Sequence, residues 1–295
     1  MYQFSTAQEM LTICSRESSD IAEITILSEM EASGRGRDFI WAKMEEQFAV
    51  MQESIKNGLS PDIRSLGGLI GGNAYRLHQH MQNNCISGRT LTKAASYALA
   101  VTEVNAAMGK IIAAPTGGAS GTLPGVIMAL MEDRNIPGDV AVNALLVGAA
   151  IGKIIASQAT LSGAEGGCQA ECGSAAAMAA AAAVYMAGGS AEMSVNAAAM
   201  ALKGLLGLVC DPVAGLVEVP CSKRNATGTA HAMLCADMAL AGITSFIPLD
   251  EVVEAMARVG RMMSPDLRET AQGGCAATAT ARAHVLKIRG LEADQ

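Results

Sequence analysis

Apolar residues recur along most of this chain at the three- and four-residue spacing of a helix face, while the alternation of a half-buried strand is nearly absent. Capping residues at 18–20 and a closing Gly34 bound the first clear helix, which keeps Ile21, Ile24 and Leu27 on one side. The same signals predict further helices ending at Gly58, starting after a Thr90 cap over 91–108, running from 138 to about 157, and over 170–187, 191–207, 222–241 and 249–262.

The fold class follows from this pattern. Only Val213–Val219 shows a short β-like alternation, so the sequence predicts an all-α fold. We expect one large helical domain over residues 1–295, in which residues 1–60 form more charged N-terminal helices and residues 90–280 form the core. Runs of alanine and glycine let helices approach closely, and the 18 methionines fill gaps that aromatic side chains would otherwise occupy.

The composition excludes several classes of function. The 295 residues carry 28 acidic against 21 basic side chains, a formal net charge of −7, which argues against nucleic acid or an anionic membrane as the main partner. Hydrophobic residues make up 51% and the mean hydropathy is +0.29, but the alanine-rich run Ala175–Gly189 is too short to span a bilayer. Residues 1–30 lack the apolar stretch of a signal peptide. We therefore expect a soluble cytoplasmic protein whose eight cysteines stay reduced.

The first candidate site is a glycine-rich segment at 114–124 that leads into a helix beginning near Thr122. Backbone N–H groups and small hydroxyls at such a helix start can bind an anion, and a carboxylate suits the absence of a P-loop lysine. A tight loop between two helices explains the pattern equally well. The candidate binding residues are Thr116, Gly117, Gly118, Ser120 and Gly121.

Two further glycine-rich breaks carry cysteines. The segment 161–173 places Cys168 and Cys172 with two glutamates where a loop passes into a helix, a position that favours thiolate and metal binding. Cys210 and Cys221 flank a Pro/Gly-rich turn. A zinc site formed by these four cysteines would have an unusually long spacing between Cys210 and Cys221. An iron–sulfur cluster fits a large helical domain better. On spacing alone, metal binding is only slightly favoured over the alternative that these cysteines are buried structural thiols.

The motifs at these breaks resemble the iron–sulfur-dependent L-serine dehydratase family, specifically the α chain of its two-subunit form. The block Cys210-Asp-Pro-Val-Ala-Gly-Leu-Val-Glu-Val-Pro-Cys221 is the most specific match. The other matching segments are 105–109, 114–124, 162–171, 224–226, 236–242 and 267–274, so the resemblance covers nearly the whole sequence.

The resemblance implies a helical catalytic domain built around a [4Fe–4S] cluster that Cys168, Cys210 and Cys221 hold. Cys172 stands where the family commonly has an apolar residue, and as a fourth ligand it would occupy the open iron; Cys275 stands where the family commonly has leucine. Single-chain members carry an extra N-terminal domain and end in cysteine, and this sequence has neither. A separate β chain is therefore the implied partner, in a hetero-oligomer.

The implied reaction is the elimination of water from L-serine to give pyruvate and ammonia, with the open iron acting as a Lewis acid on the β-hydroxyl. The βαβ alternation expected of a pyridoxal phosphate fold is missing. Glu165 and Glu171 are candidates for the base, although both could be helix-start charges, and Arg268 is a candidate for the substrate carboxylate, although it could be a structural ion pair. The four histidines lie outside the matching segments. The alternatives are a related L-cysteine desulfidase and a non-catalytic metal-binding subunit.

Overall fold

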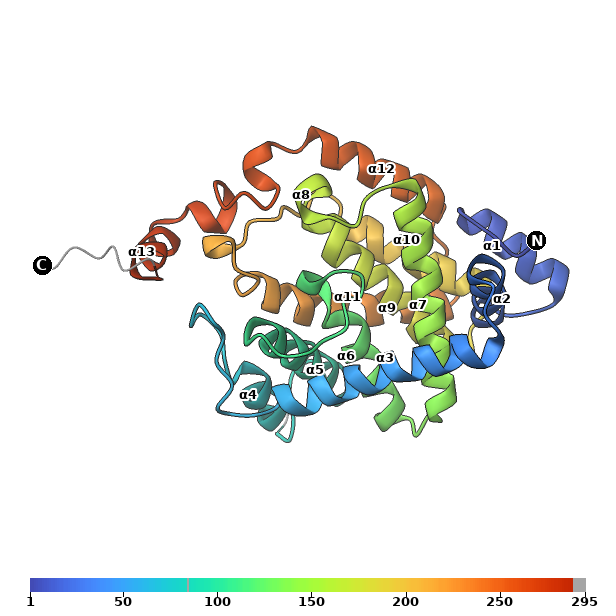
Figure 1. Ribbon diagram of the computed structural model, residues 1–295, viewed down its shortest axis with the longest axis horizontal. Helices are drawn as coiled ribbons and strands as arrows, with labels where there is room; N and C mark the ends of the chain where they lie inside the picture. The colour runs from blue at the N-terminus through green and yellow to red at the C-terminus, as the bar shows by residue number, and fades with distance from the viewer. Residues whose placement is uncertain (84, 289–295) are drawn as a thin grey trace, which may run out of the picture.

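The computed structural model describes residues 1–83 and 85–288, and within these ranges the regular structure is helical (Figure 1). The α-helices are α1 (Ala7–Glu17), α2 (Ile21–Ser33), α3 (Arg37–Gly58), α4 (Asn73–His80), α5 (Arg89–Ala106), α6 (Thr122–Asp133), α7 (Gly138–Gln158), α8 (Gly163–Gly166), α9 (Ser174–Met186), α10 (Ala191–Gly204), α11 (Cys221–Leu240), α12 (Leu249–Met262) and α13 (Ala279–Ile288). The all-α prediction is confirmed. The one β-type contact in the described ranges is an isolated parallel bridge between Cys210 and Arg268.

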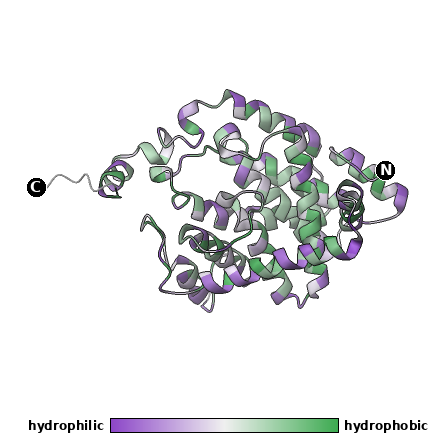
Figure 2. Cartoon of the chain, in the orientation of Figure 1, coloured by the Kyte–Doolittle hydropathy of each residue, from purple (hydrophilic) through white to green (hydrophobic). Residues whose placement is uncertain are grey.

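Helix α9 forms the centre of the molecule, with α6, α7, α10 and α11 packed around it. All of its residues from Ser174 to Val184 are buried, and most of them are alanine. Side chains this small let the neighbouring backbones come close, which is how an aromatic-poor sequence reaches a dense core. Figure 2 shows these inner helices mainly in hydrophobic colours, whereas the outer helices α3 and α12 carry hydrophilic positions along their length.

Two glycines are required where α5 meets its neighbours. A Cβ on Gly58, the last residue of α3, would lie 2.1 Å from the carbonyl oxygen of Ala100. A Cβ on Gly121, directly before α6, would lie 2.3 Å from the carbonyl oxygen of Ala98. Any side chain at these positions would therefore push α5 away from α3 or α6.

Helix α7 is long and apolar enough to cross a membrane by length and composition, with a mean hydropathy of 1.9 over its most apolar window. This helix, rather than the alanine-rich run considered in the sequence, is therefore the one to weigh as a span. The fraction of that window buried inside the protein is 67%, and α7 packs against α9 and α2. The burial is that of a core helix, so α7 is only weak evidence for a membrane.

Several predicted boundaries agree with the structure and others need correction. Asp20 caps α2, α6 begins at Thr122, and 249–262 is a helix as predicted. Thr90 is not a cap, because α5 starts one residue earlier after Gly88. The β-like alternation at 213–219 is also wrong: Val213–Gly215 forms a short 3₁₀ turn, since the surrounding prolines and glycine favour turns.

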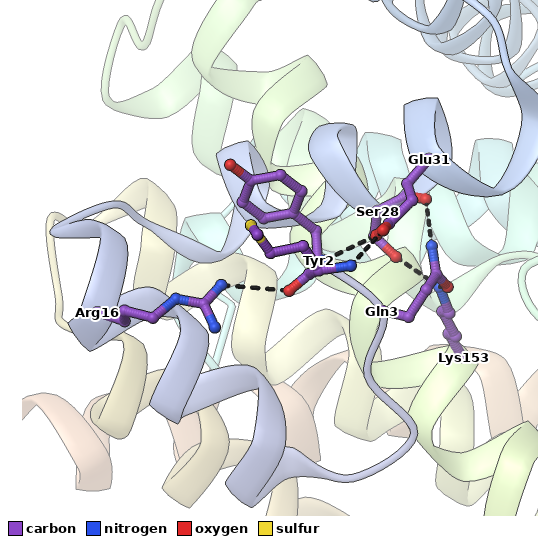
Figure 3. Close-up of polar contacts among 7 residues, drawn as sticks. Tyr2, Gln3, Arg16, Ser28, Glu31 and Lys153 are labelled. Carbon is purple, nitrogen blue, oxygen red and sulfur yellow. Dashed lines mark hydrogen bonds and ion pairs between the residues drawn. The ribbon is translucent and has the colours of Figure 1, made fainter.

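The N-terminal segment is fixed to the body of the protein by polar contacts (Figure 3). The backbone N–H of Tyr2 donates to Glu31 of α2 over 2.7 Å, and the amide of Gln3 donates to the carbonyl oxygen of Ser28 over 2.6 Å. Lys153 of α7 donates to the hydroxyl of Ser28 over 2.8 Å. Lys153 also donates to the side-chain oxygen of Gln3 over 3.3 Å, so the segment links α2 to the polar edge of α7.

Candidate functional site

Three of the segments that the sequence singled out meet in one small apolar cluster. Its buried members are Ala119, Cys168, Cys172, Ala175 and Cys210, and Leu208 packs against them. The 114–121 segment, the 162–173 segment and the strand-like residues before the 3₁₀ turn at 213–215 each contribute a wall. The convergence of the glycine-rich breaks therefore defines the candidate site.

A single turn of π-helix, Gln169–Gly173, places the chemistry of the second segment. Gln169 is fully buried and fixes this turn: its side-chain amide donates to the carbonyl oxygens of Gly166 (2.9 Å) and Met256 (3.1 Å), and its oxygen accepts from the N–H of Gly207 (2.9 Å). Wide π-turns are frequent at functional sites because they redirect side chains within a helix. Here the turn brings Cys168 and Cys172 onto the same side.

The sulfur atoms of Cys168 and Cys172 lie 3.2 Å apart. Hydrogen bonds from the thiols of Cys172 and Cys210, together with the positive charge of Arg224, lower the pKa of Cys168 far below its usual value. The proton is correspondingly held on its neighbours, and the pKa values of Cys172 and Cys210 are raised, first by their hydrogen bonds to Cys168 and then by burial. The group therefore favours one thiolate among buried thiols, the form that binds metal.

Backbone pairing and an ion pair hold Cys210 in position. Its N–H donates to the carbonyl oxygen of Leu267 (2.8 Å), and its own carbonyl oxygen accepts from the N–H of Glu269 (2.7 Å). The next residue, Asp211, is 2% exposed and pairs with Arg224 of α11 over 2.8 Å. Arg224 also donates to the carbonyl oxygen of Val209 over 2.7 Å. Arg224 therefore links α11 to the cysteine-bearing segment and supplies a positive charge beside it.

Cys221 is the first residue of α11 and is buried, but it lies outside the apolar cluster that holds the other three thiols. Burial raises the pKa of Cys221 to about 12, with smaller contributions from the charges of Cys168 and Glu171. Cys221 therefore lies within electrostatic reach of the same site. The structure thus brings Cys168, Cys172 and Cys210 together and leaves Cys221 at the edge of the group.

Glu171 is the acidic side chain at the centre of the site. The hydroxyl of Thr116 donates to its Oε1 over 2.7 Å, and the sulfur of Cys210 lies 3.6 Å from its Oε2. A Cβ on Gly163 would lie 2.5 Å from Oε2 and 2.9 Å from the Cys210 sulfur, so only glycine leaves room for this contact. Burial raises the pKa of Glu171 to about 7. Glu171 can therefore hold or release a proton near neutral pH.

Most donors of the predicted anion-binding segment are used inside the protein. The Thr116 hydroxyl donates to Glu171, the Ser120 hydroxyl to the carbonyl oxygen of Gly117 (2.9 Å), and the N–H of Gly121 to the side chain of Asn225 (2.9 Å). The N–H groups of Gly117 and Gly118 remain; both residues are partly exposed, and Gly118 lies beside Glu171. Anion binding by this segment stays a prediction, confined to those two groups.

Arg268 and Glu165 lie beside each other at the edge of the site. The guanidinium of Arg268 makes a long contact of 3.4 Å to the backbone oxygen of Glu165, and its Nε is buried without a hydrogen-bond partner among the described residues. An unpartnered buried N–H is costly, so a ligand acceptor is the natural complement. The side chain of Glu165 is exposed, unlike that of Glu171.

Sequence reasoning missed three charged residues that organise the site: Asp211, Arg224 and Glu218. Glu218 is 2% exposed and accepts from the hydroxyl of Ser65 (2.6 Å) and from the N–H groups of Gly67 (2.6 Å) and Leu69 (3.0 Å). It therefore fixes the 65–70 loop onto the turn between Cys210 and Cys221. Charged residues inside an apolar, glycine-rich stretch were the available signal.

Cys14, Cys85, Cys235 and Cys275 lie outside the apolar cluster. Cys14 and Cys235 are buried in α1 and α11, and Cys275 is exposed, with its N–H donating to Asp211 over 2.6 Å. Within residues 1–83 and 85–288, no group of three or more His, Cys, Asp or Glu side chains forms a site for a single metal ion.

Comparison with known proteins gives one consistent result. The chain matches the family described as "Serine dehydratase alpha chain" over residues 16–276. "Probable L-serine dehydratase, alpha chain" of Bacillus subtilis (strain 168) is 47% identical, over 97% of this chain and 96% of that protein. "L-serine dehydratase, alpha chain" of Peptoniphilus asaccharolyticus is 43% identical, over 94% of this chain and 95% of that protein. "L-serine dehydratase" of Streptomyces coelicolor (strain ATCC BAA-471 / A3(2) / M145) is 37% identical, over 93% of this chain but only 61% of the longer relative.

Proposed function

This chain belongs to the serine dehydratase alpha chain family, and from that premise we propose that it catalyses the elimination of water from L-serine. The product of elimination is 2-aminoacrylate, whose imine tautomer hydrolyses to pyruvate and ammonia. The observation that carries the proposal is the contact of Glu171 with Cys210 and Thr116, beside the buried thiols of Cys168 and Cys172. An acidic group, a hydroxyl donor and candidate sulfur ligands thus meet in one place.

The donor set fits a [4Fe–4S] cluster. Thiolates are the ligands of iron–sulfur clusters, and this site offers buried, unpaired cysteines with one of them favoured as thiolate. We propose Cys168, Cys210 and Cys221 as the ligands, with Cys172 as the competitor for one of these places because of its 3.2 Å contact with Cys168. A cluster bound by three cysteines supplies an open iron that acts as a Lewis acid towards a hydroxyl group.

Arg268 and the N–H groups of Gly117 and Gly118 are the proposed partners of the substrate carboxylate. The buried Nε of Arg268 lacks a partner among the described residues, and the two glycines are partly exposed, with Gly118 bordering Glu171. A guanidinium and two backbone donors are a standard complement to a carboxylate. They would orient the substrate with its α-carbon towards Glu171.

We assign the role of proton acceptor to Glu171 rather than Glu165. Glu171 lies inside the site, held by the hydroxyl of Thr116, whereas the Glu165 side chain is exposed. A base must lie within hydrogen-bond reach of the proton that it removes, so geometry favours Glu171. The hydroxyl of Thr116 fixes one oxygen and leaves the other directed towards Cys210.

We also propose that a separate β chain completes the enzyme. The Bacillus and Peptoniphilus relatives are named alpha chains and match this chain over nearly their full length, whereas the Streptomyces relative is longer. A second polypeptide would supply the part that the longer relative carries in one chain.

The test is anaerobic production of the chain with and without the β chain, followed by iron analysis and assay of pyruvate formation. We expect about four irons per chain, and we expect serine turnover only when this chain and the β chain are both present. A colourless protein without iron would overturn the cluster. Turnover of L-cysteine in place of L-serine would point to a desulfidase, and iron binding without turnover of either would point to a non-catalytic subunit.

Cys210→Ser and Cys235→Ser form a matched pair, because each places a hydroxyl at a buried thiol. We expect Cys210→Ser to lose iron and activity, while Cys235→Ser in α11 keeps both. Full activity in Cys210→Ser would refute its role as a ligand.

A further inference from the structure

Glu269 lies beside the site but has no part in the reaction described so far. Its N–H donates to the carbonyl oxygen of Cys210 over 2.7 Å, which brings the residue next to a proposed ligand. Its backbone is left-handed, with φ of 64°, and so is that of Ala271, with φ of 56°. Non-glycine residues adopt this conformation at a cost, and such residues gather at functional sites. The bridge between Cys210 and Arg268 holds the strained segment in place.

The side chain of Glu269 lines a cavity of about 850 Å³ between the 213–215 turn, the 269–272 segment and α13. Helix α13 lies apart from the main body of helices, near the C-terminal end of the chain (Figure 1). Polar side chains of Thr270, Gln272 and Arg282 line the same cavity. Within the described residues, the Glu269 carboxylate makes no hydrogen bond or ion pair. It is an exposed negative charge without a direct polar partner, on the residue whose backbone pairs with Cys210.

The other acidic side chains near the site are already engaged or lie apart from it. Asp211 pairs with Arg224, Glu218 accepts three hydrogen bonds from the 65–70 loop, and Glu171 accepts from Thr116. Beyond burial and the charge of Cys168, the charge of Glu269 also raises the pKa of Glu171. Glu269 is therefore a carboxylate without a direct partner within electrostatic reach of Glu171.

An α-amino acid substrate needs two opposite charges in its site, one for its carboxylate and one for its ammonium group. Arg268 supplies the positive charge, with its Nε unpartnered among the described residues, and Glu269 follows it in the sequence. We propose that the carboxylate of Glu269 binds the ammonium group of the substrate and so selects amino acids over hydroxy acids. The proposal rests on the proposed function and adds the residue that recognises the amino group.

The test measures steady-state kinetics of the iron-loaded enzyme assembled with its β chain. Glu269→Gln removes the charge but keeps the shape, and Glu269→Asp keeps the charge. We expect Glu269→Gln to raise KM for L-serine roughly 10- to 100-fold, with kcat within about threefold of wild type and unchanged iron content. Glu269→Asp should recover part of the loss. Glu251→Gln, at an exposed position of α12, is the control and should match wild type.

A second measurement uses 3-hydroxypropanoate, which is serine without its amino group, as an inhibitor. Its inhibition constant should not change in Glu269→Gln, because the ammonium contact is absent; where it inhibits neither enzyme, the KM result decides. A KM within twofold of wild type, a loss of iron, or an equal weakening of 3-hydroxypropanoate would overturn the proposal. The proposal would also be overturned if Glu165→Gln raised KM for L-serine and Glu269→Gln did not. A wild-type enzyme without serine turnover overturns the proposed function, and this inference with it.

Discussion

Glu171 acquires its chemistry from residues far away in the sequence. Thr116 lies 55 positions before it and Cys210 lies 39 positions after it, yet both contact its carboxylate. The sequence placed Glu165 and Glu171 together as candidates because both stand close to Cys168. It could not choose between them, since the choice depends on which side chain the helices bury. The same holds for Arg224 and Asp211, whose pairing depends on how α11 packs.

Replacing Glu171 by glutamine tests its proposed role. An amide still accepts the hydrogen bond from Thr116 but cannot take up a proton, so we expect kcat to fall roughly 10²- to 10⁴-fold. The iron content should not change, because the cysteines are untouched. Rates of pyruvate formation and iron analysis measure the two quantities, with Glu251→Gln as the control. A normal kcat in Glu171→Gln, or a loss of iron, would contradict the assignment.

At the scale of the element, helices that follow their own periodicity were predictable. Three predicted helices have boundaries within three residues of the observed ones: 191–207 is α10, 222–241 is α11 and 249–262 is α12. The π-turn at 169–173 was not predicted, because its geometry depends on the contacts of the buried Gln169 with Gly166, Met256 and Gly207. The alternation at 213–219 wrongly predicted β structure, because a strand needs a partner strand and a local pattern cannot tell whether one is present.

The junction of α3 and α5 gives a test of helix packing. Gly58→Ala would place a methyl group against the backbone of Ala100, so we expect a loss of about 1–3 kcal/mol in the free energy of unfolding. Gly138→Ala, at the start of α7, has no atom within 4 Å of the new Cβ and should be neutral or slightly stabilising. Urea denaturation of both variants measures the difference. Equal stabilities would show that α3 can shift at no cost.

The contact of Glu218 with the 65–70 loop predicts a local change of dynamics. Glu218→Ala leaves the hydroxyl of Ser65 and the N–H groups of Gly67 and Leu69 without their acceptor. We expect faster hydrogen exchange over the 65–70 loop, measured by mass spectrometry, with smaller effects elsewhere. Glu218→Gln should lie between, because it keeps one acceptor oxygen.

Glu103→Ala is the matched control for Glu218→Ala, since this buried carboxylate accepts instead from the N–H groups of Asn73 and Ala74 at the start of α4. Its loss should speed hydrogen exchange at α4 rather than in the 65–70 loop. Unchanged exchange over 65–70 in Glu218→Ala would show that the loop is held by other contacts.

For the whole molecule, composition and periodicity together were enough to predict an all-α protein. One continuous apolar cluster runs from Phe4 to Met256 and includes most of α7 and α9. The site lies beside this core in a much smaller cluster of its own. Because the core is made of alanine and branched aliphatic side chains, it does not need the site for its stability. The glycine-rich segments, in contrast, have few apolar contacts to hold them together.

Removal of iron should therefore affect the site segments far more than the core. If the cysteines hold a cluster, chelation under anaerobic conditions removes ligand binding from the native state, and we expect the Tm to fall by roughly 5–10 °C. Hydrogen exchange should rise over 163–173 and 208–221, while α7 and α9 stay protected. Cys210→Ser should resemble the iron-free wild type and show no further change with chelator. An identical Tm with and without iron would mean that the segments are already fixed by their hydrogen bonds, in particular those of Gln169 and Glu218.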